Sequence, residues 1–346
     1  MAHTTFLGYQ GMKAHLVRAE RSELEDWHTA IREELQEVEE RLLEAIGSDV
    51  PAVFDLSKHL LSAGGKRLRP GLVVLSSKAL GSADQTRVTS MAVTVELIHM
   101  ASLMHDDVVD HSEFRRGRVT TNAFWGNKLS VLGGDCILAK AFSFLARDGD
   151  QRIMRVISDM TIRMSESEVL QALCERDVEG WRKHYWRIIR HKTAGFLSAC
   201  CRCGAILAQA SPAAEEALAA YGMELGMAFQ LTDDLLDIVG EPGITGKAIG
   251  SDLRDGKVTL PVILALDSMT EPERARTRAL IEKDDLSSEA LEGLCSSIRA
   301  TEAPEMARDC ARTYAERATA LLAKLPPSSA RDGLGLLASE MIYRIS

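Results

Sequence analysis

The sequence has few aromatic residues and no long hydrophobic stretch. Phenylalanine, tryptophan and tyrosine make up only 5% of its 346 residues. This scarcity favours helices over strands, because aromatic and β-branched side chains are the ones enriched in sheets. No uninterrupted apolar run approaches the roughly 18 residues of a membrane-spanning helix, so we expect no such span. Residues 1–26 also lack the apolar core of a secretory signal peptide.

An excess of positive charge is lacking as well. The 41 lysines and arginines are outnumbered by 50 aspartates and glutamates, and the formal net charge is −9. This balance excludes a general affinity for nucleic acid, and we expect no nucleic-acid partner. Basic clusters within an acidic protein indicate a confined anionic ligand instead.

Cysteine is present, but its number, seven, is odd. The run "CCRC" at 200–203 could suggest a metal site. Its helical setting, "LSACCRCGAILA", instead indicates small thiols packed into a core. Reduced thiols are typical of the cytoplasm, and we predict a cytoplasmic protein.

Most of the chain has the periodicity of helices, and strict two-residue alternation is nearly absent. An amphipathic segment begins at Ser22 and ends near Gly47. Further helices are expected at 71–80, 86–105, 128–146, 151–176, 213–239, 258–267 and 305–324. Since no long linker divides these segments, we predict an N-terminal tail (1–21) and one all-α domain (22–346).

An acidic motif, "LMHDDVVD" at 103–110, ends an otherwise apolar segment. Asp106 and Asp110 lie one helical turn apart and share a face, whereas Asp107 lies about 100° around the helix. A polar stripe on a buried helix is typical of a wet cavity or of fully paired groups. The motif "QLTDDLLD" at 230–237 repeats the pattern later in the chain.

Three interpretations of these motifs compete: a solvated charged face, a calcium loop, and a metal site for a polyanion. Apolar flanks disfavour a solvated face, and the EF-hand glycine and terminal glutamate are missing. Paired carboxylates near a helix C-terminus repel each other and the helix dipole, so a cation should compensate. Oxygen-only ligands favour Mg²⁺, above all when phosphate supplies the remaining ligands.

Basic residues beside glycines provide the other half of a polyanion site. Lys66, Arg67 and Arg69 follow two glycines in "SAGGKRLRPG", and "GEPGITGKAIGSDLRDGKVTLP" at 240–261 contains five glycines and several cations. Glycine-rich loops bring backbone N–H groups and lysines close to phosphate. Each cluster alone is also compatible with a solvated turn, but together they flank both acidic motifs.

The ordered set of motifs resembles the trans-polyprenyl diphosphate synthases. "GGKRLRP", "ELIHMASLMHDDVVD", "RRG", "HKTA", "FQLTDDLLD", "GSDLRDGKVTLP" and "LPPSSARDGLGLLASEMIYR" carry the resemblance, which spans about residues 22 to 345. It implies a single bundle of long helices around a deep central cavity, usually paired as a homodimer. It also implies condensation of isopentenyl diphosphate with an allylic diphosphate, and at most peripheral membrane contact for product release.

The resemblance assigns roles to individual residues. It places three Mg²⁺ ions on Asp106, Asp110 and Asp233, assisted by Asp107, Asp234 and Asp237. It places the allylic diphosphate on Arg115, Lys192, Lys247 and Lys257, and isopentenyl diphosphate on Lys66, Arg69, His99 and Arg116. Thr193 and Gln230 would face the carbocation and, with Lys192, form the catalytic group.

Small residues before the first motif imply a long product. Ala101 and Ser102 stand five and four positions before Asp106, where short-chain members of the family often carry aromatic rings. The open channel implies a product of roughly thirty to forty carbons. Residues expected at the floor of the channel are Leu97, Ile98, Phe142 and Phe144.

Two positions depart from the family pattern: Val119 replaces a common proline after "RRGR", and Ser167 replaces a usual glycine. Several alternatives remain open: a shorter, geranylgeranyl-type synthase, a class I terpene cyclase, a non-catalytic subunit of a heteromeric synthase, and a magnesium-dependent module that binds isoprenoid diphosphates. The isopentenyl site and the six aspartates argue against the cyclase and the inactive subunit.

Overall fold

The structure is a computed structural model that describes residues 26–81, 84–240, 249–283 and 286–343. Its first half contains η1 (Trp27–Ile31), α2 (Arg32–Ala45), α3 (Pro51–Leu61), α4 (Leu68–Ala79), α5 (Gln85–Val109), β1 (Phe114–Arg115), β2 (Arg118–Val119), α6 (Thr121–Trp125), α7 (Asn127–Asp148) and α8 (Gln151–Leu173). Its second half contains α9 (Val178–Ile189), η2 (Arg190–Ala194), α10 (Gly195–Leu207), α11 (Pro212–Val239), α13 (Ser251–Arg254), α14 (Leu260–Ser268), α15 (Glu271–Ile281), α16 (Ser288–Arg299), α17 (Ala303–Leu321), η3 (Leu322–Lys324) and α18 (Ser329–Tyr343).

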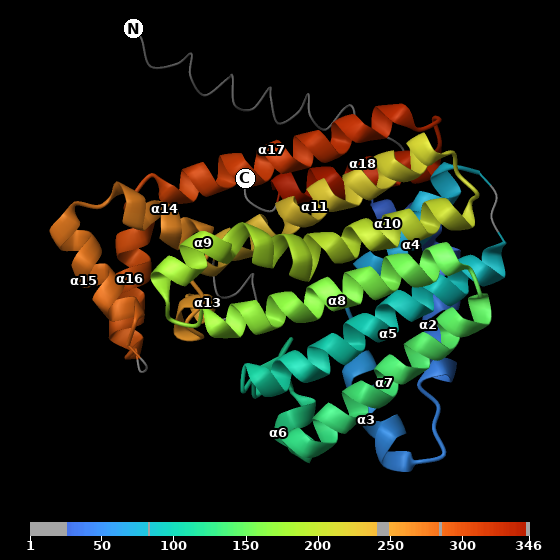
Figure 1. The fold of residues 1–346 in the computed structure, drawn as a ribbon, viewed down its shortest axis with the longest axis horizontal. Helices are drawn as coiled ribbons and strands as arrows, with labels where there is room; N and C mark the ends of the chain where they lie inside the picture. The colour runs from blue at the N-terminus through green and yellow to red at the C-terminus, as the bar shows by residue number, and fades with distance from the viewer. Residues whose placement is uncertain (1–25, 82–83, 241–248, 284–285, 344–346) are drawn as a thin grey trace, which may run out of the picture.

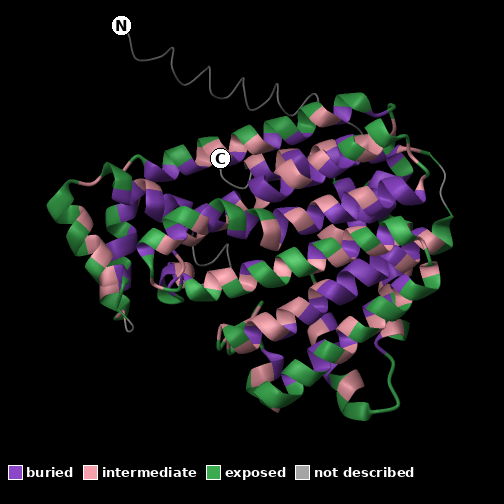
Figure 2. Ribbon diagram, viewed as in Figure 1, coloured by how far each residue is buried: buried purple, intermediate pink, exposed green. Residues whose placement is uncertain are grey.

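The long helices lie roughly parallel in one bundle, with α15 and α16 at one end (Figure 1). Helices α4, α5, α10 and α11 carry much of the buried surface, whereas α7 and α8 expose one side (Figure 2). A second apolar cluster joins α9, α11, α14, α16 and α17. The predicted all-α bundle is therefore confirmed.

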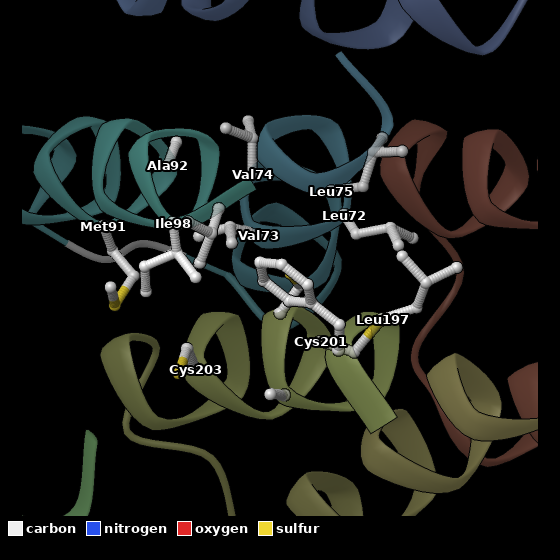
Figure 3. Packing of buried hydrophobic residues seen from close by; sticks show 14 of the residues in the cluster. Leu72, Val73, Val74, Leu75, Met91, Ala92, Ile98, Leu197, Cys201 and Cys203 are labelled. Carbon is white, nitrogen blue, oxygen red and sulfur yellow. The ribbon is translucent and has the colours of Figure 1, made fainter. Parts of the chain in front are cut away.

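The thiols of the "CCRC" run lie in the core rather than around a metal. Figure 3 shows Cys201 and Cys203 of α10 packed near Val73 of α4 and Ile98 of α5. Burial raises the pKa of Cys201 to about 12, so the thiol stays protonated. All seven cysteines are free thiols.

The helix boundaries follow local signals, with two exceptions. The starts of the two helices that carry the acidic motifs were predicted to within one residue, and Asp84 and Ser211 cap them there, but α5 runs four residues beyond its predicted end at 105. The helix expected from Ser22 is described only from Trp27, as a 3₁₀ turn followed by α2, and its predicted start lies outside the described residues. The two-residue strands β1 and β2 form an antiparallel hairpin that the periodicity did not indicate.

Helix α7 is long and apolar enough, by length and composition alone, to pass as a membrane span. The same test is passed by core helices of soluble proteins, and α7 packs along α5. Its outward side carries exposed apolar residues, among them Leu129, Leu132 and Phe142.

Candidate active site

A cavity of about 420 Å³ lies where the C-terminal ends of α5 and α11 face α8 and η2. Asp106 of α5, Asp110 at the C-terminal cap of α5, and Asp233 of α11 line it. Lys192 and Lys257 line the same cavity, so both acidic motifs and two basic segments meet there. The structure thus brings together side chains that the sequence separates by more than a hundred positions.

The first motif divides its aspartates between two environments. Asp106 and Asp110 face the cavity, one helical turn apart. The side chain of Asp107 is only 2% exposed. Its Oδ1 accepts a hydrogen bond of 2.8 Å from Arg115 Nε and lies 2.8 Å from Arg115 Nη2 in an ion pair. Asp107 therefore orients Arg115, which lines the cavity. Burial raises the pKa of Asp106, against the lowering effect of Lys192.

The second motif buries its middle aspartate among neutral donors. Asp234 accepts a hydrogen bond of 2.6 Å from the Tyr185 hydroxyl and one of 2.8 Å from Gln230 Nε2. Thr193 donates in turn to Gln230 Oε1 at 2.7 Å, and both residues line the cavity. Burial, followed by the charge of Asp252, raises the pKa of Asp234 to about 8 although both hydrogen bonds lower it.

The last aspartate of the second motif, which the resemblance assigns to metal binding, contacts the start of α13. Asp237 accepts hydrogen bonds from the backbone N–H groups of Ser251 and Asp252, at 3.0 and 3.1 Å, and from Ser251 Oγ at 2.6 Å. These contacts cap the start of α13, and Asp237 is not among the residues that line the cavity. Asp252 lines it instead, a placement that sequence reasoning missed although "GSDLRDGK" stood beside the predicted Lys257.

Lys257 links the end of α5 to the loop before α14. Its Nζ lies 3.3 Å from Asp110 Oδ2 and 3.6 Å from Asp255 Oδ2. Burial alone would lower the pKa of Lys257, but these carboxylates and Asp252 outweigh burial and raise it. Lys257 is therefore charged inside the cavity. Lys247, the other cation predicted in this segment, lies outside the described residues.

Only some of the residues expected to bind the second diphosphate, isopentenyl diphosphate, line the cavity. Arg69, His99 and Arg116 line the cavity, and Arg69 stacks 4.7 Å from the Phe196 ring centroid. Arg69 Nε is buried and has no hydrogen-bond partner among the described residues, although buried donors normally have one. Lys66 does not line the cavity: its side chain is 68% exposed and lies 3.4 Å from Glu340.

Burial and the adjacent Arg69 lower the pKa of His99 well below its usual value. His99 is therefore neutral near pH 7. The neighbouring Arg67, which shares its motif with Lys66 and Arg69, has a structural role. It pairs with buried Glu96 at 2.8 Å and with Glu39.

A close helix contact places Lys192 and Thr193. Lys192 and Thr193 stand in η2, a π-helical turn between α9 and α10. Gly226 of α11 lets this turn approach, because a Cβ there would collide with the backbone of Ala194. The glycine thereby brings Thr193 within hydrogen-bonding distance of Gln230.

The deeper wall of the cavity contains the predicted chain-length residues. Ile98, Ala101 and Ser102 all line it. Leu138 of α7 and Thr161 and Met164 of α8 complete this region, and sequence reasoning did not find them. The other three residues expected at the floor, Leu97, Phe142 and Phe144, do not line the cavity: Leu97 is buried in the core, and Phe142 is 37% exposed on the outer side of α7.

A helical bundle with two acidic helix ends and basic groups around one cavity defines the class of the protein, the all-α isoprenoid synthase fold. Residues 50–298 match the family model described as "Polyprenyl synthetase". The chain belongs to this family.

Individual relatives extend the match over nearly the whole chain. An octaprenyl diphosphate synthase from Escherichia coli is 37% identical over 93% of this chain and 99% of its own length. A short chain isoprenyl diphosphate synthase from Methanothermobacter thermautotrophicus is 35% identical over 91% and 97%.

Solved structures agree. A decaprenyl diphosphate synthase from Rhodobacter capsulatus superposes with a TM-score of 0.87 at 37% identity, covering 92% of this chain and 98% of that one. A polyprenyl synthase from Caulobacter crescentus, complexed with calcium and isoprenyl diphosphate, gives 0.88 at 34% identity, covering 92% and 97%.

Proposed function

We propose that this protein condenses isopentenyl diphosphate with an allylic diphosphate and so extends an all-trans polyprenyl diphosphate. The observation that carries the proposal is the meeting of Asp106, Asp110 and Asp233 in one cavity with Lys192 and Lys257. The cavity continues from these charged groups to an apolar wall, which suits a ligand with an anionic head and a hydrocarbon tail.

The donor set fits Mg²⁺. Its ligands are carboxylate oxygens, which hard cations prefer. Among the described residues, no three His, Cys, Asp or Glu side chains lie close enough to hold an ion by themselves. We therefore propose that Asp106, Asp110 and Asp233 hold magnesium, as three ions by family resemblance, together with diphosphate oxygens. Bound magnesium would stabilise the negative charge that develops on the leaving diphosphate.

The chain's own residues bind and orient the two substrates. Lys192, Lys257 and Arg115 receive the allylic diphosphate and stabilise it as a leaving group. Arg69 and Arg116 receive isopentenyl diphosphate, which supplies the anion that the buried Arg69 Nε lacks. Thr193 and Gln230 present their oxygens to the allylic cation. Neutral His99 is held beside Arg69, and the released diphosphate accepts the final proton.

We propose a long-chain product, in line with the small Ala101 and Ser102 on the cavity wall. At about 25 Å³ per carbon, from benzene in an engineered cavity of about 150 Å³, the cavity of about 420 Å³ holds roughly 17 carbon atoms. A product of roughly thirty to forty carbons must therefore displace the deeper wall near Leu138 and Thr161 as it grows.

Incubation with radiolabelled isopentenyl diphosphate, each allylic primer and magnesium tests the proposal directly. We expect incorporation into products longer than the primer, separated by chromatography. Loss of primer diphosphate without incorporation would identify a terpene cyclase. Inactivity of the purified chain, restored by a second protein, would identify a subunit of a heteromeric synthase. Diphosphate binding without turnover would identify a binding module.

Product length has its own test. In Ala101→Phe the new ring enters the cavity next to Ser102, so we expect the product distribution to shift to shorter chains. Val95→Phe is a less suitable control, because that buried site has no room for a ring. Leu43→Phe, at a side chain 49% exposed on α2, is matched in chemistry and should leave the distribution unchanged.

We further propose a cytoplasmic homodimer with at most peripheral membrane contact. The outward faces of α7 and α8, two helices in contact, expose Leu132, Phe142, Ile162, Val169 and Leu173. A second copy of the chain would cover these apolar side chains. Sedimentation of Leu132→Glu/Val169→Glu as a monomer, against a dimer for the parent protein, would support this assembly.

A further inference from the structure

Glu168 lies on the wall of the cavity and has no role in the function described so far. It stands on α8, whose cavity-lining residues Thr161, Ser165 and Glu168 recur at helical spacing. A carboxylate opposes the binding of an anionic substrate, and Asp106 and Asp110 already supply acidic ligands. Its presence in this cavity therefore calls for a specific reason.

The contacts of Glu168 supply that reason. Lys192 Nζ lies 2.8 Å from Glu168 Oε1 and 2.9 Å from Oε2. Gln171, one turn further along α8, accepts from the same Nζ at 3.4 Å. The side chains of Lys192 and Glu168 are 27% and 30% exposed, so water screens the pair only in part.

The position of Lys192 explains why such an anchor is needed. The π-helical turn fixes the backbone of Lys192, but its flexible four-carbon side chain can place the ammonium over several ångströms. An ammonium has three N–H donors, and the acceptors on α8 engage some of them. Those acceptors thereby fix the position of the ammonium, and its remaining N–H groups can donate to a diphosphate.

The charges around the pair agree with this arrangement. Burial raises the pKa of Glu168, as do Asp106 and Asp110, whereas Lys192 lowers it. Lys192 likewise lowers the pKa of Asp106. One ammonium therefore interacts with a carboxylate on each side of the cavity, and Glu168 holds it on the α8 side.

We propose that Glu168 is a positioning residue that holds the Lys192 ammonium on the α8 wall, ready for the leaving diphosphate. This inference rests on the proposed function. It differs from a purely structural ion pair, because a structural pair would affect folding stability without affecting the chemical step through Lys192.

The test is Glu168→Gln, which keeps the shape and one acceptor but removes the charge. We expect kcat for condensation to fall about tenfold, since a hydrogen bond to a charged group is weakened. The KM for isopentenyl diphosphate should stay within about twofold, because Arg69 and Arg116 are untouched. Glu166→Gln is the matched control: it removes the same charge from an exposed residue of α8 that does not line the cavity.

A double-mutant cycle with Lys192→Gln makes the assignment specific. Single-turnover transfer of radiolabelled isopentenyl diphosphate should show no further loss when Glu168→Gln is added to Lys192→Gln. Circular dichroism should show all variants folded. Two results would overturn the inference while wild-type turnover still supports the proposed function. One is an equal rate for Glu168→Gln and Glu166→Gln. The other is a loss of rate from Glu168→Gln that is as large in the Lys192→Gln background as in the wild type. A wild-type protein that incorporates no isopentenyl diphosphate would overturn both.

Discussion

The ends of α5 and α11 carry the same pattern of three aspartates but use it differently. At the end of α5 the middle residue, Asp107, pairs with the charged Arg115. At the end of α11 the middle residue, Asp234, is held by the neutral donors Tyr185 and Gln230. Burial raises the pKa of both carboxylates, but the charge of Arg115 opposes this rise at Asp107, whereas Asp234 has only neutral hydrogen-bond donors and its pKa rises to about 8.

The third aspartates differ more. Asp110 faces the cavity and contacts Lys257, whereas Asp237 caps α13. The segments that follow explain the difference. A short hairpin follows α5 and leaves Asp110 beside the cavity, but the chain after α11 returns through Gly250, whose N–H donates to the Asp237 carbonyl at 2.8 Å. Motifs with the same aspartate spacing thus differ in structure because the segments around them differ.

The largest effect is expected where the two ends are equivalent. Asp106→Asn and Asp233→Asn each remove a cavity-facing carboxylate, and we expect each to lower kcat at least about 100-fold, as does the loss of other electrostatic groups at developing charge. Single-turnover incorporation of isopentenyl diphosphate measures this. A loss confined to one of the two variants would contradict a site shared between both helices.

The third aspartates should separate the two ends. Asp110→Asn removes a cavity carboxylate and should lower kcat about 10- to 100-fold. Asp237→Asn should change kcat less than about tenfold but lower the free energy of unfolding by about 1 kcal/mol, because it weakens the cap of α13. Steady-state kinetics and urea unfolding of both variants make the comparison. An equal loss of kcat would assign Asp237 to the cavity after all.

For the middle aspartates, loss of a charged partner should lower the free energy of unfolding more than loss of a neutral partner. Arg115→Met leaves the buried Asp107 carboxylate unpaired and should lower the free energy of unfolding by roughly 2–4 kcal/mol, somewhat reduced by the partial exposure of Arg115. Tyr185→Phe removes one neutral donor from Asp234 and should cost about 1–2 kcal/mol. Urea unfolding at pH 7 without metal gives both values. A larger loss for Tyr185→Phe than for Arg115→Met would show that the α11 end depends more on its neutral partner for stability.

The last comparison concerns pH. The folded-state pKa of Asp234 is about 8, above the ordinary value of 3.8. The folded state therefore retains this proton longer, and the stability from this group is complete below pH 3.8 and lost as the pH rises through about 8. Between pH 5 and pH 8.5, the free energy of unfolding of the metal-free parent protein should fall more than that of metal-free Asp234→Asn. Identical pH slopes in urea unfolding with chelator would contradict the raised pKa.

Local reasoning succeeded where a signal lies within one helix. The starts of α5 and α11, the end of α11, and the shared face of Asp106 and Asp110 follow from helical periodicity. It failed where a partner comes from elsewhere in the chain. Glu168 looked like any helical glutamate, and Phe142 looked buried because sequence alone does not say which face of α7 meets the bundle.

The amino-acid sequence by itself determined the helical class and the inventory of acidic and basic groups, since periodicity and residue chemistry are local properties. Only the tertiary structure decided which of those groups share one cavity. In the folded protein Asp233 lines the cavity, Asp237 caps the start of α13, and Lys66 lies beside Glu340. The physical reason is that burial and pairing depend on neighbours far away in the chain, which packing alone brings together.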